Sequence, residues 1–92
     1  MTLDQFVDEL IKRAAPKGYS PTIFMRMREN YGTVTAIQKL VETSEPQSGF
    51  RRLQKLGMTE WCLESAVVRF PDQFTRKTLE YARARLDGVF DA

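Results

Sequence analysis

Apolar residues recur along this chain at the intervals of amphipathic α-helices. In the most informative stretch, Ser20 is a favourable N-cap, Pro21 suits a first helical turn, and Gly32 supplies a left-handed stop. The apolar residues between these signals lie at helical spacing: Ile23, Phe24, Met27 and Tyr31. Thr33 follows directly and can cap the next helix. The stretch therefore predicts a helix of residues 21–31, a glycine turn and a second helix.

Matching start and stop signals predict six helices in all. The paired signals, in chain order, are Thr2 and Pro16, Ser20 and Gly32, Thr33 and Glu42, Ser48 and Gly57, Thr59 and Pro71, and Thr75 and Gly88. Residues 43–47 are expected to form a loop, and Val89 is placed for the apolar contact that often follows a helix end. No stretch alternates apolar and polar residues between turn signals, so no strand is predicted. We expect an all-α, compact, single-domain bundle of about six short helices over residues 1–92.

The fifth predicted helix is apolar around most of its circumference. Such a helix usually lies at the centre of its bundle. Trp61 and Val68 would lie on the side of the helix away from Leu63, and a tryptophan near arginines is typical of an interface hot spot. Either these two side chains are exposed and bind a partner, or a neighbouring helix covers them.

Composition describes an ordinary soluble protein. Ninety-two residues with 42% hydrophobic and 28% charged side chains suffice for one domain with one core. One cysteine excludes an intramolecular disulfide and fits a reducing compartment. No apolar run has the roughly 20 residues of a membrane span, and the N-terminus lacks the layout of a secretory signal. We therefore expect a cytoplasmic protein with no membrane partner.

Residues suited to catalysis are scarce. The chain has no histidine, and Cys62 stands in an apolar context that predicts a buried, inert thiol. Glu60 and Glu64 would share a helix face, but no further ligands lie near them in the sequence. The five glycines are isolated at helix boundaries, so no phosphate-binding loop is indicated. The sequence predicts no enzyme, no cofactor, no metal and no small-molecule substrate.

The helix–glycine–helix unit over residues 21–42 also fits a helix-turn-helix DNA reader. Its second helix would offer four polar side chains to a major groove: Thr33, Thr35, Gln38 and Lys39. However, Arg28 and Gln38 fall where such motifs bury small or apolar side chains, and this helix carries a single basic residue. An αα-hairpin of the core is the favoured interpretation.

Basic residues gather in the second half of the chain. Arg51 and Lys55 would share a helix face, with Arg52 beside them. On the sixth predicted helix, a basic stripe with one aromatic residue is formed by Lys77, Tyr81 and Arg85. Such surfaces bind phosphate backbones and stack bases. The neighbouring stripe of the sixth helix alternates in sign, which is typical of a solvated face with ion pairs, so both interpretations stay open.

Several short marks stand in a characteristic order. They are Tyr19-Ser20-Pro21-Thr22 followed by Phe24 and Met27, then Gly32, Ala36 and Leu40, Gly49-Phe50 with Leu53, the helix of residues 63–68, and Phe74-Thr75 ahead of Ala82-Arg83-Ala84-Arg85-Leu86. Together they resemble a family of small, stand-alone bacterial helical proteins, over residues 7–86. That family has no assigned activity and no catalytic motif, so the resemblance implies a helical fold alone. The chain departs from the pattern at Thr33, which replaces a second glycine, and at Gln54-Lys55-Leu56, where the family tends to carry tryptophan and acids.

These observations predict a non-enzymatic interaction module that binds a protein partner or a second copy of itself. The alternative is a nucleic-acid-binding protein, either like a helix-turn-helix or through the basic face of the fourth and sixth helices. A formal net charge of +2 does not by itself demand nucleic acid. The candidate partner-binding residues are Arg51, Arg52, Lys55, Trp61, Val68, Lys77, Tyr81 and Arg85.

Overall fold

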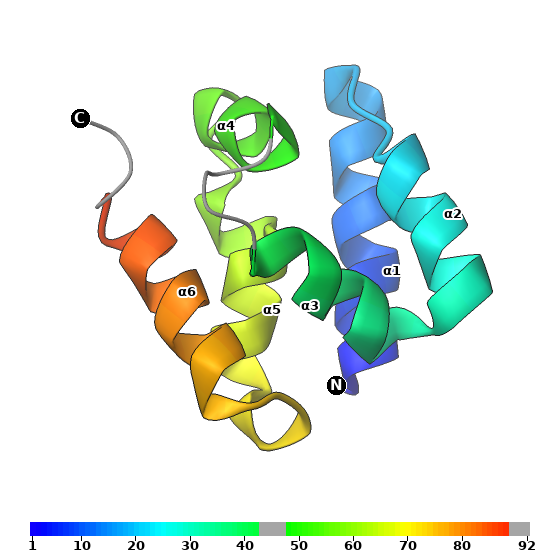
Figure 1. Cartoon of the computed structure of the whole chain (residues 1–92). Coiled ribbons are helices and arrows are strands. Elements are labelled where there is room, and N and C mark those ends of the chain that lie inside the picture. Colours follow the sequence, from blue (N-terminus) through cyan, green and yellow to red (C-terminus); the bar gives the residue numbers. More distant parts are fainter. Residues whose placement is uncertain (43–47, 89–92) are drawn as a thin grey trace.

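The computed structural model describes residues 1–42 and 48–88 of the chain, and over these residues it holds six α-helices and no strand (Figure 1). The predicted all-α class is therefore confirmed. The predictions for residues 43–47 and for Val89 lie outside the described residues. The α-helices are α1 Leu3–Ala14, α2 Thr22–Tyr31, α3 Thr33–Val41, α4 Ser48–Lys55, α5 Leu63–Arg69 and α6 Arg76–Leu86, and three single 3₁₀ turns are η1 Ala15–Lys17, η2 Thr59–Trp61 and η3 Pro71–Gln73.

Local signals set most helix ends where the sequence predicts them. The capping box of α1 is formed: Thr2 Oγ1 accepts from the N–H of Gln5 at 3.1 Å, and Gln5 Oε1 accepts from the N–H of Thr2 at 2.8 Å. Thr75 caps α6, since its side-chain oxygen accepts from the N–H of Thr78 at 3.3 Å. Gly32 separates α2 from α3 with φ of 86°, a value that strains any residue with a Cβ.

Four predicted helix starts are wrong. Ser48 is the first residue of α4 rather than its cap. Ser20 does not cap α2 with its side chain, because Pro21 occupies the N-cap position and Ser20 offers its carbonyl to the N–H of Thr22. Thr33 is the first residue of α3 rather than its cap. The fifth helix begins at Leu63 instead of after Thr59, because Cys62 is extended and its sulfur accepts the N–H of Ser65.

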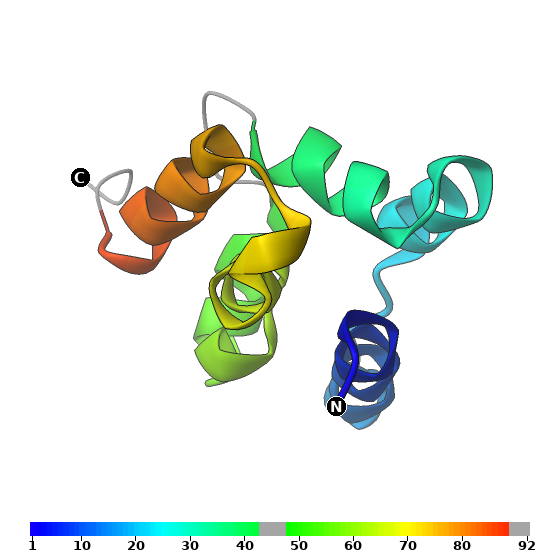
Figure 2. The same cartoon turned by 90° about the horizontal axis from the view of Figure 1, so that it is seen from below.

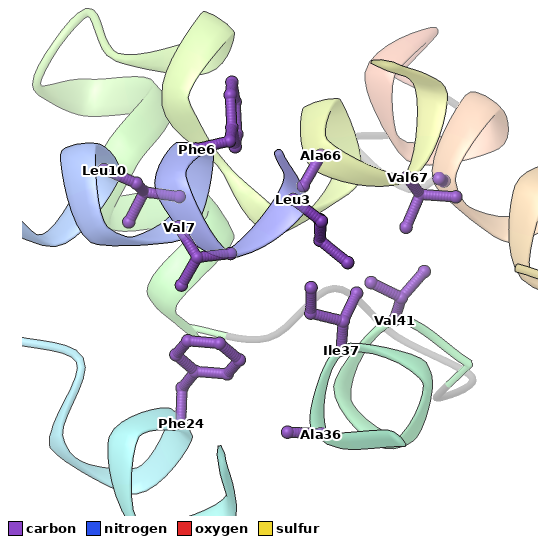
Figure 3. Packing of buried hydrophobic residues seen from close by; sticks show 11 residues of the cluster. Leu3, Phe6, Val7, Leu10, Phe24, Ala36, Ile37, Val41, Ala66 and Val67 are labelled. Atoms are coloured by element: carbon purple, nitrogen blue, oxygen red, sulfur yellow. The ribbon is translucent and has the colours of Figure 1, made fainter. Parts of the chain in front are cut away.

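The central position predicted for the fifth helix is confirmed, since α5 packs against α1, α3 and α6. Figure 2 shows α3 bridging two halves of the molecule, with α1 and α2 on one side and α5 and α6 on the other. Side chains from all of these helices meet in the main core (Figure 3), formed by Leu3, Phe6, Val7, Leu10, Phe24, Ala36, Ile37, Val41, Ala66, Val67 and Ala82. A second, smaller cluster lies under α4 and contains Ala14, Phe50, Leu53, Met58 and Cys62. The radius of gyration is 12.0 Å, as expected of a compact chain of this length.

A buried ion pair joins α6 to α5 and to α3. Arg85 Nη1 of α6 lies 3.0 Å from Glu64 Oε2 of α5, and it also donates to the carbonyl of Leu40 in α3 at 3.1 Å. The two charged side chains are 0% and 4% exposed. The predicted exposure of Arg85 is therefore wrong. The buried residues of α6 are Thr78, Ala82 and Arg85, so its inward face passes through Arg85. The predicted basic stripe assumed that Arg85 shares an outward face with Lys77 and Tyr81.

A second polar cluster fastens α1 to the α2–α3 hairpin at the surface. The Arg28 guanidinium lies 2.8 Å from Asp8 Oδ1 and 3.0 Å from Asp4 Oδ1, and its Nε donates to Thr33 Oγ1 at 2.9 Å. Thr33 in turn donates its hydroxyl proton to Asp4. These bonds, above all the one from Thr33 and next those from Arg28, lower the pKa of Asp4 below its ordinary value.

Loss of the buried arginine should strongly destabilise the protein. Arg85→Met leaves the Glu64 carboxylate buried without its counter-charge, and we expect the free energy of unfolding to fall by about 3 to 5 kcal/mol in urea titrations. Adding Glu64→Leu should restore much of this loss, because the double variant buries no charge. Arg76→Met, at a side chain that is 90% exposed, is the control. A loss as small as that of the control would contradict the structural role of the pair.

The Asp4 cluster should make part of the stability depend on pH. Because the folded protein holds the pKa of Asp4 below the unfolded value, the folded state binds fewer protons, and its stability falls as the pH drops from about 5 toward that lowered pKa. Asp4→Asn and Thr33→Val should both make the unfolding free energy less dependent on pH over this range, as measured by urea titration at each pH. An unchanged dependence in both variants would show that the cluster does not carry it.

Candidate partner-binding cleft

A cleft of about 210 Å³ opens between the α1–α2 turn and α4. Figure 1 shows these two segments facing one another at the same end of the molecule. Five helices supply its apolar walls: Leu10 from α1, Phe24 from α2, Leu40 and Val41 from α3, Phe50 and Leu53 from α4, and Leu63 from α5. Four polar side chains also line it, those of Tyr19, Ser20, Thr22 and Glu64. The cleft therefore lies where the main core and the smaller cluster meet.

One large apolar side chain stands exposed at the edge of the cleft. Ile23 lines it and is 69% exposed, whereas the neighbouring Phe24 is buried. Further along α2, Tyr31 is 56% exposed. The spacing of these residues predicts a helix correctly, but it does not show which of them face inward. Ile23 therefore extends the apolar lining of the cleft to the surface.

Tyr19 and Gly49 close one wall of the cleft by direct contact. A Cβ built on Gly49 would lie 2.5 Å from the Tyr19 hydroxyl, so the absence of a side chain there is what lets the phenol pack against α4. Burial raises the pKa of Tyr19, although the nearby Arg52 guanidinium opposes that shift. The hydroxyl is therefore protonated at neutral pH and can donate a hydrogen bond at the wall.

The outer face of α4 is basic. Arg51, Arg52 and Lys55 are exposed on it, and Lys17 Nζ donates to the carbonyl of Leu56 at 3.4 Å, next to the end of the helix. The printed sequence has no acidic residue from Ser48 to Thr59. Because the opposite face of α4 supplies Phe50 and Leu53 to the cleft, the basic face and the cleft share one helix.

The sixth helix does not provide the predicted second basic face. Arg85 is buried, Lys77 Nζ lies 3.5 Å from Glu42 Oε1, and Tyr81 is half-buried against the main core. Thr78 donates to the other Glu42 oxygen at 2.6 Å. The start of α6 therefore makes its own contacts with the end of α3, at a distance from α4.

Trp61 is largely covered. Its ring stacks on Phe6, with centroids 4.9 Å apart and an interplanar angle of 17°, and the Arg13 guanidinium lies 4.3 Å from its ring centroid. Val68 on α5 is 37% exposed. Neither Trp61 nor Val68 lines the cleft. The contacts of Trp61 join η2 to α1.

Polar groups of the α2–α3 hairpin make contacts within the protein, some of them to α1. Thr33, which a DNA reader would offer to bases, is bonded to Asp4 and Arg28. The Lys39 ammonium lies 5.0 Å from the centroid of the Tyr31 ring. These contacts fit the αα-hairpin of a core, which is the interpretation that the sequence favours.

The groups considered for catalysis lie apart from one another. Burial raises the pKa of the Cys62 thiol to about 11, and the thiol donates to the carbonyl of Thr59 at 3.0 Å. Glu60 is exposed in η2 whereas Glu64 is buried in α5, so they share no helix face. Within residues 1–42 and 48–88, no three cysteine or carboxylate side chains are grouped to hold a metal ion. In the same ranges no helix has the length and apolar character to cross a membrane.

Comparisons of the chain with protein-family models, with curated proteins and with solved structures found no match. The family resemblance carried by the ordered marks stays an expectation, and the functional argument depends on the cleft itself.

The contact between Tyr19 and Gly49 can be tested with a double-mutant cycle. Gly49→Ala alone adds helix propensity, worth about 1 kcal/mol, but its Cβ meets the Tyr19 hydroxyl, which must shift. In a Tyr19→Phe background that obstacle is gone, and Gly49→Ala should then stabilise the protein in thermal and urea unfolding. Equal effects of Gly49→Ala in both backgrounds would contradict the contact.

Proposed function

We propose that this protein is a non-enzymatic interaction module that binds a protein partner through the cleft and the basic face of α4. The observation that carries the proposal is an apolar cleft with an exposed isoleucine at its edge, formed in part by a helix whose other face carries Arg51, Arg52 and Lys55. Protein interfaces combine an apolar centre, which supplies most of the binding energy, with a polar rim that excludes water. The cleft supplies such a centre, and the basic face on the other side of α4 adds charged contact area.

Binding is favoured over catalysis by the chemistry of the groups near the cleft. Tyr19 is protonated at neutral pH, and Glu64 is engaged by Arg85. The chain has no histidine to act as a general base at neutral pH. The polar groups at this site are therefore suited to orient a bound group.

Nucleic-acid binding is the weaker alternative. It depended on five basic residues, of which Arg85 is buried and Lys77 is paired with Glu42. The basic residues of α4 stay exposed, but they span a helix of only eight residues. A phosphate backbone also gains little from an apolar cleft, so the cleft favours a protein partner.

Site-specific photo-crosslinking in cells tests the proposal. A photoreactive phenylalanine analogue at Ile23 or Lys55, both exposed, should give adducts that protease removes and nuclease leaves intact. The same analogue at Arg76, the first residue of α6, should give little adduct. Figure 1 shows that α6 begins at the end of the molecule away from α4. Circular dichroism of each purified variant verifies that it is folded.

Two outcomes would contradict the proposal. One is adduct formation that is absent at both Ile23 and Lys55, or as strong at Arg76 as at Ile23. The other is adducts that nuclease destroys, which would assign the α4 face to nucleic acid instead.

A further inference from the structure

We infer that the partner protein inserts one tyrosine side chain into the cleft, and that the hydroxyl of this tyrosine donates a hydrogen bond to the buried carboxylate of Glu64. This inference rests on the proposed function and names the group that the cleft recognises. It depends only on residues that line the cleft: its aromatic walls, the Glu64 carboxylate and the Tyr19 hydroxyl.

The volume of the cleft sets the size of the occupant. An apolar cavity of roughly 150 Å³ accepts a molecule the size of benzene. The cleft measures about 210 Å³, so in proportion it holds about eight or nine non-hydrogen atoms. Sites for cofactors and drug-sized ligands are larger, at roughly 300–1,000 Å³. The matching occupant is a single side chain between phenylalanine and tryptophan in size.

The walls of the cleft favour an aromatic ring. Three aromatic side chains line it, those of Tyr19, Phe24 and Phe50. Aromatic rings that meet edge to face or in an offset stack attract one another beyond the effect of burial alone. Phe24 belongs to the main core and Phe50 to the smaller cluster, so both rings are held in place by their neighbours. An aromatic occupant therefore fits these walls better than an aliphatic one of the same volume.

Glu64 gives the occupant a group to bond to. Its side chain is 4% exposed, it forms part of the lining, and Arg85 bonds to one of its two oxygens, Oε2. An ionised carboxylate can accept about four hydrogen bonds. Burial raises the pKa of this carboxyl although the bond from Arg85 opposes the shift. A further donor would therefore stabilise the ionised form.

The charges at the cleft select a neutral occupant. Arg85 already balances the charge of Glu64, so a lysine or arginine of the partner would lose its hydration with no unbalanced charge to pair with. An aspartate or glutamate would lose its hydration and also meet a like charge. Tyrosine carries a donor without a charge, and its hydroxyl needs a partner once it is buried.

Tyr19 distinguishes tyrosine from tryptophan as the occupant. Burial raises the pKa of the Tyr19 hydroxyl, Arg52 opposes this shift, and the Glu64 carboxylate adds to it. The hydroxyl is therefore within electrostatic reach of Glu64, and both groups line the same cleft. Because it is protonated at neutral pH, it can donate to the oxygen of an inserted tyrosine. An indole N–H can donate to Glu64 but offers no acceptor in return.

Free 4-methylphenol, which is the side chain of tyrosine without its backbone, tests the recognition without presuming a partner sequence. Nuclear magnetic resonance titration of the full chain should give saturable shifts at cleft residues such as Tyr19, Leu40 and Phe50. We expect a dissociation constant of about 1 mM or lower. The matched ligand is p-xylene, in which a methyl group replaces the hydroxyl. The preference for 4-methylphenol over p-xylene should be about tenfold smaller in the Arg85→Met, Glu64→Leu double variant, which lacks the carboxylate.

Random peptides displayed on phage test whether the occupant belongs to a protein. Peptides enriched on the wild-type protein should share a tyrosine. Phenylalanine in its place should weaken binding about fivefold through loss of the hydrogen bonds, and alanine should abolish binding. The Tyr19→Phe protein should bind a tyrosine peptide about fivefold more weakly than wild type. Tyr31→Phe, the same change at a side chain outside the cleft, should bind as wild type does.

Four results would overturn the inference. They are enriched peptides that share no tyrosine, equal binding of tyrosine and phenylalanine peptides to the wild-type protein, an unchanged ligand preference in a folded double variant, and binding of 4-methylphenol with no peptide enriched. The last result would assign the cleft to a free small molecule. The peptide comparison uses the wild-type protein, so it decides the question even if the double variant does not fold.

The crosslinking experiment separates this inference from the proposed function. If nuclease-resistant adducts form at Ile23 and tyrosine peptides do not bind, the protein-binding function stands and only the inserted group is wrong. If no adduct forms and no peptide is enriched, both proposals fail together.

Discussion

The buried contact between Arg85 and Glu64 is the constraint on which the packing of α6 against α5 and α3 depends. Taking a charged group out of water costs several kcal/mol, and only good geometry and further hydrogen bonds offset it. Arg85 meets this demand through Glu64 of α5 and the carbonyl of Leu40, which lies in the last turn of α3. A cation also suits this position, because the C-terminal end of a helix is the negative end of its dipole. One side chain thus fixes α6 against both α5 and α3.

The same contact determines the shape of the cleft. Arg85 bonds to Leu40 and to Glu64, and both of these residues line the cleft. Leu63, next to Glu64 in the chain, lines it as well. The opposite wall depends on Tyr19, which packs against α4 at Gly49. The cleft is therefore bounded on both sides by specific contacts between segments far apart in the sequence. This arrangement gives a site whose dimensions are set by the fold and do not depend on a bound ligand.

The sequence predicts the helices well because the relevant signals are local. The capping box of Thr2 and the stop at Gly32 act within a few residues, and they place helix ends without knowledge of the rest of the chain. A local signal mispredicts the helix start where the side chain of the expected cap bonds to a residue far away in the sequence. Thr33 would be a good cap, yet its hydroxyl bonds to Asp4, which is 29 positions away.

The site was harder to predict because burial is a tertiary property. Helical spacing groups Lys77, Tyr81 and Arg85 on one stripe, but it cannot show that the inward face also passes through Arg85. An arginine is normally exposed, and bonds to the Glu64 carboxylate and the Leu40 carbonyl help to make the burial of Arg85 stable. Ile23 is the opposite case, an apolar residue left outside. The basic face of α4 was predictable, since an amphipathic helix with no acidic residue shows it in the sequence alone.

The cleft lies at the boundary between two hydrophobic clusters of unequal size, and this position links binding to folding. The smaller cluster, which supports α4, has five buried members, so α4 depends on fewer apolar contacts than the helices of the main core do. Local stability follows the density of such contacts. An apolar group bound between Leu10 and Leu53 would contact both clusters. By mass action, any partner that binds only the folded cleft stabilises α4 together with the rest of the chain. The cleft is thus formed in part by the helix that the smaller cluster supports, so binding there and the local stability of α4 are linked.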